Sequence, residues 1–211
     1  MKHFKHFFHA SEESKQVFIL LHGTGGRETD LLPIAGQVDP SLSVLGVRGD
    51  VMENGRFRYF ALTKDGGMDE GSLLEKTGDV LRFIEEATKT YQIDQQSFHL
   101  IGYSNGANMA ISLLLHRPDL FRSAMLFHPS HPLQSFEESD LEGLDIFMTA
   151  GAVDQITLPG EAFQLKAHLS RLGADVSMYV TDHGHELMKS EFREASKWWK
   201  EINIDDRERE S

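Results

Sequence analysis

Residues 102–106 read Gly102-Tyr103-Ser104-Asn105-Gly106, a G-x-S-x-G pattern with an apolar run at 98–101 before it and a helical pattern after it. Such a strand–turn–helix segment places its serine on a sharp, strained turn, so that the hydroxyl projects clear of the sheet. The flanking glycines are needed because a Cβ would clash with neighbouring elements. The helix that follows directs its N-terminal N–H groups and positive dipole end at the serine. The segment predicts Ser104 to be a nucleophile.

The five-letter pattern alone is weak, since a chain of this length would show it by chance about 0.1 times. The alternative is a tight turn that contains an incidental serine. The apolar strand before it and the amphipathic helix after it are the surroundings that a nucleophile turn requires. They favour the catalytic interpretation.

The rest of the chain alternates short apolar runs with helical patterns. Runs that are apolar throughout suit strands buried on both faces, as in a parallel sheet. Ser72 and Glu75 match a capping box and predict the start of the first helix. The alternation predicts an α/β fold, with a mostly parallel, doubly wound sheet flanked by helices. The predicted strands are 17–21, 43–47, 98–103, 124–127, 146–150 and 176–180, and the predicted helices are 72–91, 107–116, 161–172 and 187–200.

The bulk properties fit one globular domain, which we place at residues 1–204, followed by a charged and disordered tail at 205–211. The net charge of −12 argues against a nucleic-acid or anionic membrane surface. Zero cysteines exclude disulfides, thiolate metal sites and cysteine nucleophiles. No apolar run approaches the roughly 20 residues of a membrane span, and residues 1–10 lack the apolar core of a secretory signal. We expect a cytoplasmic protein.

A glycine-rich loop, Leu21-His22-Gly23-Thr24-Gly25-Gly26, follows the first predicted strand. Acyl transfer on this kind of fold needs two backbone N–H donors for the developing oxyanion. We expect them to be Thr24 and Asn105, the residue after the serine. A phosphate-binding loop would need a lysine that the segment lacks. Taken alone, the loop would leave the matter open, since three glycines also suit a plain turn.

Candidates for the acid and the base follow later strands. Asp154 lies just after the run 146–150, whereas Asp145 and Asp175 precede their strands and so lie at the opposite end of the sheet. The order Ser…Asp…His is the one that this fold uses. A loop aspartate that only caps a turn is the alternative. His183 and His185 both follow the last strand, and the residues alone favour His185 only modestly.

Two further histidines, His128 and His131, follow the run 124–127 with prolines between them. They could line a pocket, but a structural loop is the favoured interpretation. His183 and His185 are two residues apart without an obvious third ligand, and no H-E-x-x-H segment is present. We therefore expect neither a metal nor a cofactor.

Together these segments resemble the carboxylesterase/phospholipase family of small α/β-hydrolases, which also contains acyl-protein thioesterases. The resemblance covers about residues 15 to 200. It implies a single-domain α/β-hydrolase fold, Asp154 as the acid and His185 as the base, which decides between the two histidines. Many members carry Gln where this chain has Asn105, but only the backbone N–H of that residue is used. The resemblance rests on L-H-G-T-G-G at 21–26, G-Y-S-N-G at 102–106, R-P-D-L-F at 117–121, G-A-V-D at 151–154 and G-H-E-L at 184–187.

The resemblance implies a serine carboxylesterase that acts through an acyl-enzyme on small-molecule esters. Only about a dozen residues lie between 130 and 143, too few for a cap domain, which favours short-chain substrates. Phe60 and Met68 are candidate pocket residues, with core packing an equal alternative. A thioesterase or lysophospholipase-type acyl hydrolase and a non-catalytic ligand-binding protein remain alternatives. The sequence leaves ester against thioester preference undecided, and a homodimer is compatible with it.

Overall fold

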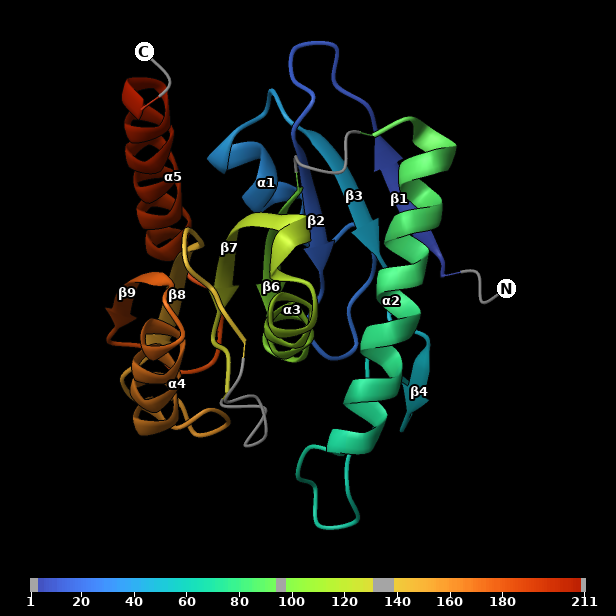
Figure 1. Ribbon diagram of the computed structural model, residues 1–211. Coiled ribbons are helices and arrows are strands. Elements are labelled where there is room, and N and C mark those ends of the chain that lie inside the picture. Colours follow the sequence, from blue (N-terminus) through green and yellow to red (C-terminus); the bar gives the residue numbers. More distant parts are fainter. Residues whose placement is uncertain (1–3, 94–97, 131–138, 210–211) are drawn as a thin grey trace.

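The computed structural model describes residues 4–93, 98–130 and 139–209, and within them a seven-stranded sheet forms the centre of the molecule (Figure 1). The strand order is β1-β3-β2-β6-β7-β8-β9, and only β1 runs antiparallel to its neighbour. The predicted mostly parallel, doubly wound sheet is confirmed. The strands are β1 His6–His9, β2 Val17–Leu21, β3 Ser43–Val47, β6 Phe98–Tyr103, β7 Phe121–Phe127, β8 Asp145–Gly151 and β9 Asp175–Thr181.

Helices cover both faces of this sheet (Figure 1). One core cluster contains side chains of α2, α3 and α4, and a second contains side chains of α1 and α5. The helices are α1 Leu32–Val38, α2 Glu70–Tyr91, α3 Asn105–His116, α4 Pro159–Arg171 and α5 Lys189–Arg209, and a small hairpin is formed by β4 Val51–Glu53 and β5 Arg56–Arg58.

Strand β2 shows why the apolar runs are continuous. Val17, Ile19 and Leu21 belong to the cluster with α2 and α3, whereas Phe18 and Leu20 belong to the cluster with α1 and α5. Successive side chains of a strand point to opposite faces, and here both faces are covered. Every position of the strand is therefore apolar.

The start of α2 differs from the prediction. The helix begins at Glu70, and Asp69 is its N-cap, with a side chain that accepts a hydrogen bond from the Ser72 N–H at 2.9 Å. The predicted capping box of Ser72 and Glu75 is wrong, because Asp69 has the extended backbone of a cap and Ser72 already lies inside the helix. The Ser72 hydroxyl instead accepts a hydrogen bond from the Ala61 N–H.

Other elements were not predicted at all or end elsewhere. The sequence pattern missed the short helix α1 and the β4–β5 hairpin. Helix α5 continues through charged residues to Arg209, beyond its predicted end at residue 200. The division into a domain at 1–204 and a tail at 205–211 stays a prediction. Residue 131, the second histidine of the proline-rich loop, lies outside the described residues.

The strand order places a topological switch at β2, which has β3 on one side and β6 on the other. In open α/β sheets the crevice at the carboxyl ends of two such strands is where ligands bind. The loop after β2 and the turn after β6 therefore meet there. None of the helices within the described residues has both the length and the apolar character that a bilayer span requires.

Candidate active site

Ser104 lies on the turn between β6 and α3 with φ 51° and ψ −115°. A positive φ is uncommon for a residue other than glycine and costs of order 1–3 kcal/mol. The Ser104 N–H donates to the Phe127 carbonyl of the neighbouring strand β7 at 2.9 Å. This bond holds the strained turn at the carboxyl edge of the sheet, and the Ser104 side chain stays partly exposed.

The glycines on either side of this turn have no room for a side chain. A Cβ on Gly106 would lie 2.0 Å from the Leu21 carbonyl oxygen, and one on Gly102 would lie 2.7 Å from Ala107 Cα. The turn therefore packs directly on the end of β2, where the glycine-rich loop begins.

Three of the sequence-predicted residues form one hydrogen-bonded series. Ser104 Oγ lies 2.8 Å from His185 Nε2, and His185 Nδ1 lies 2.7 Å from Asp154 Oδ2. The other oxygen of Asp154 accepts from the N–H groups of Ile156 at 2.8 Å and Thr157 at 2.9 Å. Burial alone would raise the pKa of Asp154, but these N–H groups and His185 outweigh it and lower the pKa. Asp154 is thus a buried, ionised acceptor.

His183, the rival candidate for the base, lies elsewhere. Its side chain is 44% exposed, and it contacts Asp182 and Glu186 on the surface. The structure therefore brings His185, and not His183, to Ser104.

The loop after β2 is held by its own histidine. The Gly49 N–H donates to His22 Nε2 at 3.0 Å, so the proton of the ring lies on Nδ1 and is donated to the Gly23 carbonyl at 2.6 Å. Burial lowers the pKa of His22, which keeps the ring neutral as this arrangement requires. A Cβ on Gly23 would lie 2.6 Å from the Tyr103 ring, so the loop packs against the turn that carries Ser104.

The β4–β5 hairpin holds the same loop from the other side. Arg58 Nη1 donates to Thr24 Oγ1 at 2.8 Å, and the Gly25 N–H donates to the Phe57 carbonyl. The next residue, Tyr59, donates its N–H to Asn105 Oδ1 at 2.8 Å. One segment therefore positions both residues that the sequence predicts as backbone donors to an oxyanion.

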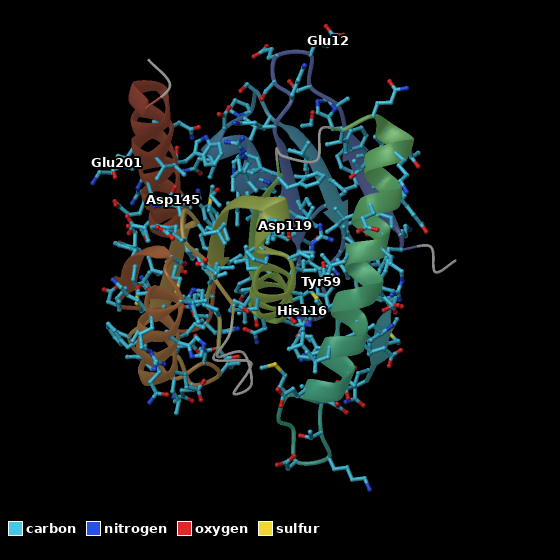
Figure 2. All side chains as sticks on the ribbon, in the orientation of Figure 1. Glu12, Tyr59, His116, Asp119, Asp145 and Glu201 are labelled. Carbon is cyan, nitrogen blue, oxygen red and sulfur yellow. The ribbon has the colours of Figure 1, made fainter. Side chains whose placement is uncertain are left out.

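Tyr59, labelled in Figure 2, is fully buried. Its hydroxyl accepts from the His22 N–H at 3.0 Å and donates to the Val47 carbonyl at 2.6 Å. Burial raises the pKa of Tyr59 well above its usual value, so the phenol keeps its proton. The tyrosine ties the glycine-rich loop to strand β3.

The two candidate pocket residues have a different environment. Phe60 is buried in the core cluster that also contains Leu73 and Val80 of α2, and Met68 is partly buried and packs against that cluster. These contacts fit the core-packing alternative that the sequence left open.

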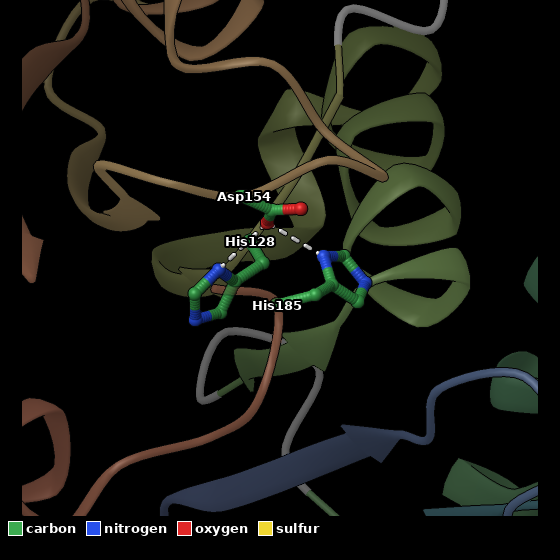
Figure 3. A group of neighbouring side chains, drawn as sticks. All are labelled: His128, Asp154 and His185. Carbon is green, nitrogen blue, oxygen red and sulfur yellow. Dashed lines mark hydrogen bonds and ion pairs between the residues drawn. The ribbon is translucent and has the colours of Figure 1, made fainter. Parts of the chain in front are cut away.

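A second histidine approaches Asp154. His128 has a side chain with no exposed surface, and its Nδ1 lies 3.2 Å from the same Asp154 Oδ2 that contacts His185 (Figure 3). The ligand atoms that His128, Asp154 and His185 offer lie within 4.8 Å of one another, close enough for a cation. Both nitrogen–oxygen distances are also ordinary hydrogen-bond lengths. The expectation of a metal-free site stays a prediction.

A model of the Phospholipase/Carboxylesterase family matches residues 6–203. The chain belongs to this family. Its fold is the α/β-hydrolase fold, and the predicted resemblance is confirmed.

Two similar proteins of known structure are carboxylesterases. The crystal structure of the Bacillus cereus carboxylesterase is 41% identical, with a TM-score of 0.90 and coverage of 94% of each chain. The carboxylesterase from Mesorhizobium loti is 30% identical, with a TM-score of 0.86 and coverage of 92% of this chain and 93% of that one. The protein MhqD of Bacillus subtilis (strain 168) is 41% identical over 191 residues, which are 90% of this chain and 96% of the relative.

Several residues that shape this family member's site have no local sequence signal. Glu191 looks like an ordinary acidic residue in the first turn of α5, yet it is fully buried beside His128. Arg58 and Tyr59 lie in a segment that the sequence marks only as aromatic. His22 is visible in the loop motif, but its bonds to Gly49 and Tyr59 depend on the tertiary fold.

Proposed function

We propose that the chain is a serine carboxylesterase that cleaves small or short-chain carboxylic esters through an acyl-enzyme on Ser104. The observation that carries the proposal is the hydrogen-bonded series from Ser104 Oγ to His185 Nε2 at 2.8 Å and from His185 Nδ1 to Asp154 Oδ2 at 2.7 Å. Membership of the Phospholipase/Carboxylesterase family supports hydrolysis of an ester bond.

The first half of the reaction follows from the proton positions. Because Asp154 is an ionised acceptor, the proton of a neutral His185 lies on Nδ1, and the Nε2 lone pair faces the Ser104 hydroxyl. As Ser104 Oγ bonds to the ester carbonyl carbon, its proton passes to His185 Nε2. The resulting imidazolium is stabilised by the Asp154 carboxylate. The imidazolium then gives the proton to the departing alkoxide, and the acyl group stays on the serine.

The negative charge on the carbonyl oxygen needs fixed donors. The Asn105 N–H is the first of α3, where an amide has no acceptor within its own helix. The Thr24 N–H is the second proposed donor, on the loop that Arg58 and Phe57 hold. In the second half of the reaction, His185 takes a proton from water, the hydroxide attacks the acyl carbonyl, and Ser104 is released with its proton restored.

The connection between β7 and β8, residues 128–144, is too short to contain a cap domain, and this supports small esters as substrates. A specific observation supports a second candidate, a hydrolase of longer acyl chains such as a lysophospholipase or thioesterase. Val153 and Ile156, on either side of Asp154, are exposed, as are Leu158 and Phe163 a few residues further on. An apolar chain that leaves the site past Asp154 could contact the exposed Val153 and Ile156.

The test compares p-nitrophenyl esters from acetate upward for the natural protein, Ser104→Ala and the control Ser196→Ala, whose hydroxyl bonds the Gln37 carbonyl on the surface. Removal of the nucleophile costs about 10⁶-fold in kcat in another serine hydrolase, so activity should vanish only in Ser104→Ala. Activity that survives in Ser104→Ala would overturn the assignment. A rate that rises steeply with chain length would favour the second candidate, and no turnover of any ester would favour a ligand-binding protein.

A further inference from the structure

The Asp154 carboxylate has more hydrogen-bonding partners than His185 alone. Oδ1 accepts from two backbone N–H groups, and Oδ2 faces the Nδ1 atoms of both His185 at 2.7 Å and His128 at 3.2 Å. Figure 3 shows Asp154 between the two imidazole rings. A serine–histidine–aspartate series needs only the contact between Asp154 and His185. The additional contact with His128 therefore needs its own explanation.

His128 is held firmly in this position. Its backbone has φ 50°, its N–H donates to the Thr149 carbonyl of β8, and its carbonyl accepts a hydrogen bond from the Thr157 hydroxyl. A strained backbone conformation persists where the surroundings fix it, and such positions cluster at functional sites. The ring is therefore directed at Asp154 by contacts from two different segments.

The far side of the His128 ring meets a second carboxylate. Glu191, in the first turn of α5, has no exposed side-chain surface, and its Oε1 lies 2.9 Å from His128 Nε2. The other oxygen, Oε2, accepts a hydrogen bond from the Met188 N–H at 2.6 Å. A buried carboxylate without a cation beside it is costly, and His128 is the basic group that faces it in this structure.

The two contacts favour a positive charge on the His128 ring. A neutral imidazole has one N–H and one lone pair, but both nitrogens of this ring face carboxylate oxygens. An imidazolium donates a hydrogen bond to Asp154 and forms an ion pair with Glu191, and it balances one of the two negative charges when both carboxylates are ionised. The other groups facing the ring are the His185 imidazole, with ring centroids 5.3 Å apart, and the Tyr103 ring, at 6.1 Å. Burial alone would lower the pKa of His128, but Glu191 and Asp154 outweigh it and raise the pKa.

We propose that His128, held by Glu191, is a positioning residue that binds Asp154 as an imidazolium and keeps His185 a neutral base. The inference rests on the proposed function of His185 and Asp154. A positive charge beside Asp154 reduces the pull of that carboxylate on a second proton at His185. His185 then keeps the Nε2 lone pair that accepts the serine proton.

The protonation of the ring is tested first, without any substrate. In protein labelled with ¹⁵N-histidine, the ring nitrogens of His128, assigned by their loss in His128→Asn, should both carry protons at neutral pH. In Glu191→Gln, His128 should become neutral, with its proton on Nδ1 facing Asp154. A singly protonated His128 in the natural protein, or stoichiometric divalent metal bound to it, would overturn the proposal. This measurement does not depend on ester hydrolysis. A failure of the proposed function would be seen in the Ser104→Ala comparison instead.

Kinetics test the effect on the base. In His128→Asn, which keeps an amide donor to Asp154 but no charge, and in Glu191→Gln, kcat on the alkaline plateau and KM should change little, because Asp154 keeps a hydrogen-bond donor. The acidic limb of the kcat/KM profile should move up by roughly half a pH unit. The control is His99→Asn, which removes a buried histidine bonded to Ser123 on β7 and should leave the limb in place. A folded Glu191→Gln protein with the natural pH profile of kcat/KM would overturn the role.

Discussion

The Tyr103 hydroxyl donates a hydrogen bond to the backbone carbonyl of His185 at 2.8 Å, and its ring lies beside the imidazole with the centroids 5.6 Å apart. Tyr103 immediately precedes Ser104, whereas His185 belongs to the loop between β9 and α5. One side chain therefore ties the loop of the proposed base to the turn of the proposed nucleophile. Burial and the nearby charges of Asp154 and Glu191 raise the pKa of Tyr103 to about 12, so it remains a donor.

Tyr103→Phe should lower kcat about fivefold, because the loss of one hydrogen bond worth about 1 kcal/mol frees the His185 backbone while the ring contact stays. KM should change little. The control is Tyr91→Phe, which removes a hydroxyl bonded to His6 at the edge of the sheet. Steady-state kinetics on a p-nitrophenyl ester check both variants, and an unchanged kcat in Tyr103→Phe would contradict the positioning role.

Asp154→Asn should lower kcat by about 10⁴-fold, as the equivalent change does in another serine hydrolase. An asparagine amide can present an N–H to His185 Nδ1, which would favour the tautomer with its proton on Nε2, facing Ser104. Asp175→Asn is the matched control, since Asp175 begins β9 and lies at the opposite end of the sheet. Equal losses in the two variants would show a general effect on folding and not on the base.

The sequence predicts those parts of the candidate site that are formed by consecutive residues. The turn at Ser104 needs an apolar strand, two glycines and a helix start, and all of these are consecutive in the chain. Asp154 likewise follows a run that reads as a buried strand. Both His183 and His185 follow the last strand, and the family resemblance decides between them. Position after a strand end is enough to bring them to one edge of a parallel sheet.

The supporting residues could not be predicted in this way because their roles depend on tertiary contacts. Glu191 follows the pattern of an acidic residue near a helix start, and only the packing of α5 against β8 and β9 buries it beside His128. The start of α2 shows the same limit. Asp69 and Ser72 are both good caps, and the path of residues 61–69 decides between them.

Gly106→Ala should destabilise the fold by several kcal/mol and abolish activity, because the new Cβ would lie 2.0 Å from the Leu21 carbonyl oxygen, which is rigid backbone. Gly36→Ala is the contrasting case. Gly36 lies inside α1 with nothing within 4 Å of a new Cβ, so alanine should stabilise the protein by about 0.5–1 kcal/mol. Thermal unfolding of both variants tests the pair, and a stable, active Gly106→Ala protein would show that the turn can move.

Stability should fall as the pH drops below about 6.5, in part through His99. His99 is buried, bonds Ser123 Oγ at 2.8 Å and contacts the Trp199 ring. Burial and the charge of Arg122 lower its pKa from 6.5 to about 3. Below pH 6.5, His99 therefore becomes protonated in the unfolded chain but stays neutral in the folded chain. The stabilisation is complete above that pH and is lost progressively as the pH falls towards 3.

His99→Asn removes this titration, and its free energy of unfolding should depend less steeply on pH. Between pH 6 and pH 4 the difference in slope should approach about 1.4 kcal/mol per pH unit, the value for one proton. Urea unfolding of the natural protein and the variant at several pH values measures both slopes. The variant should be less stable than the natural protein at pH 7.5, and the gap should narrow on acidification. A gap that stays constant would mean that His99 takes up its proton in the folded state as readily as in the unfolded chain.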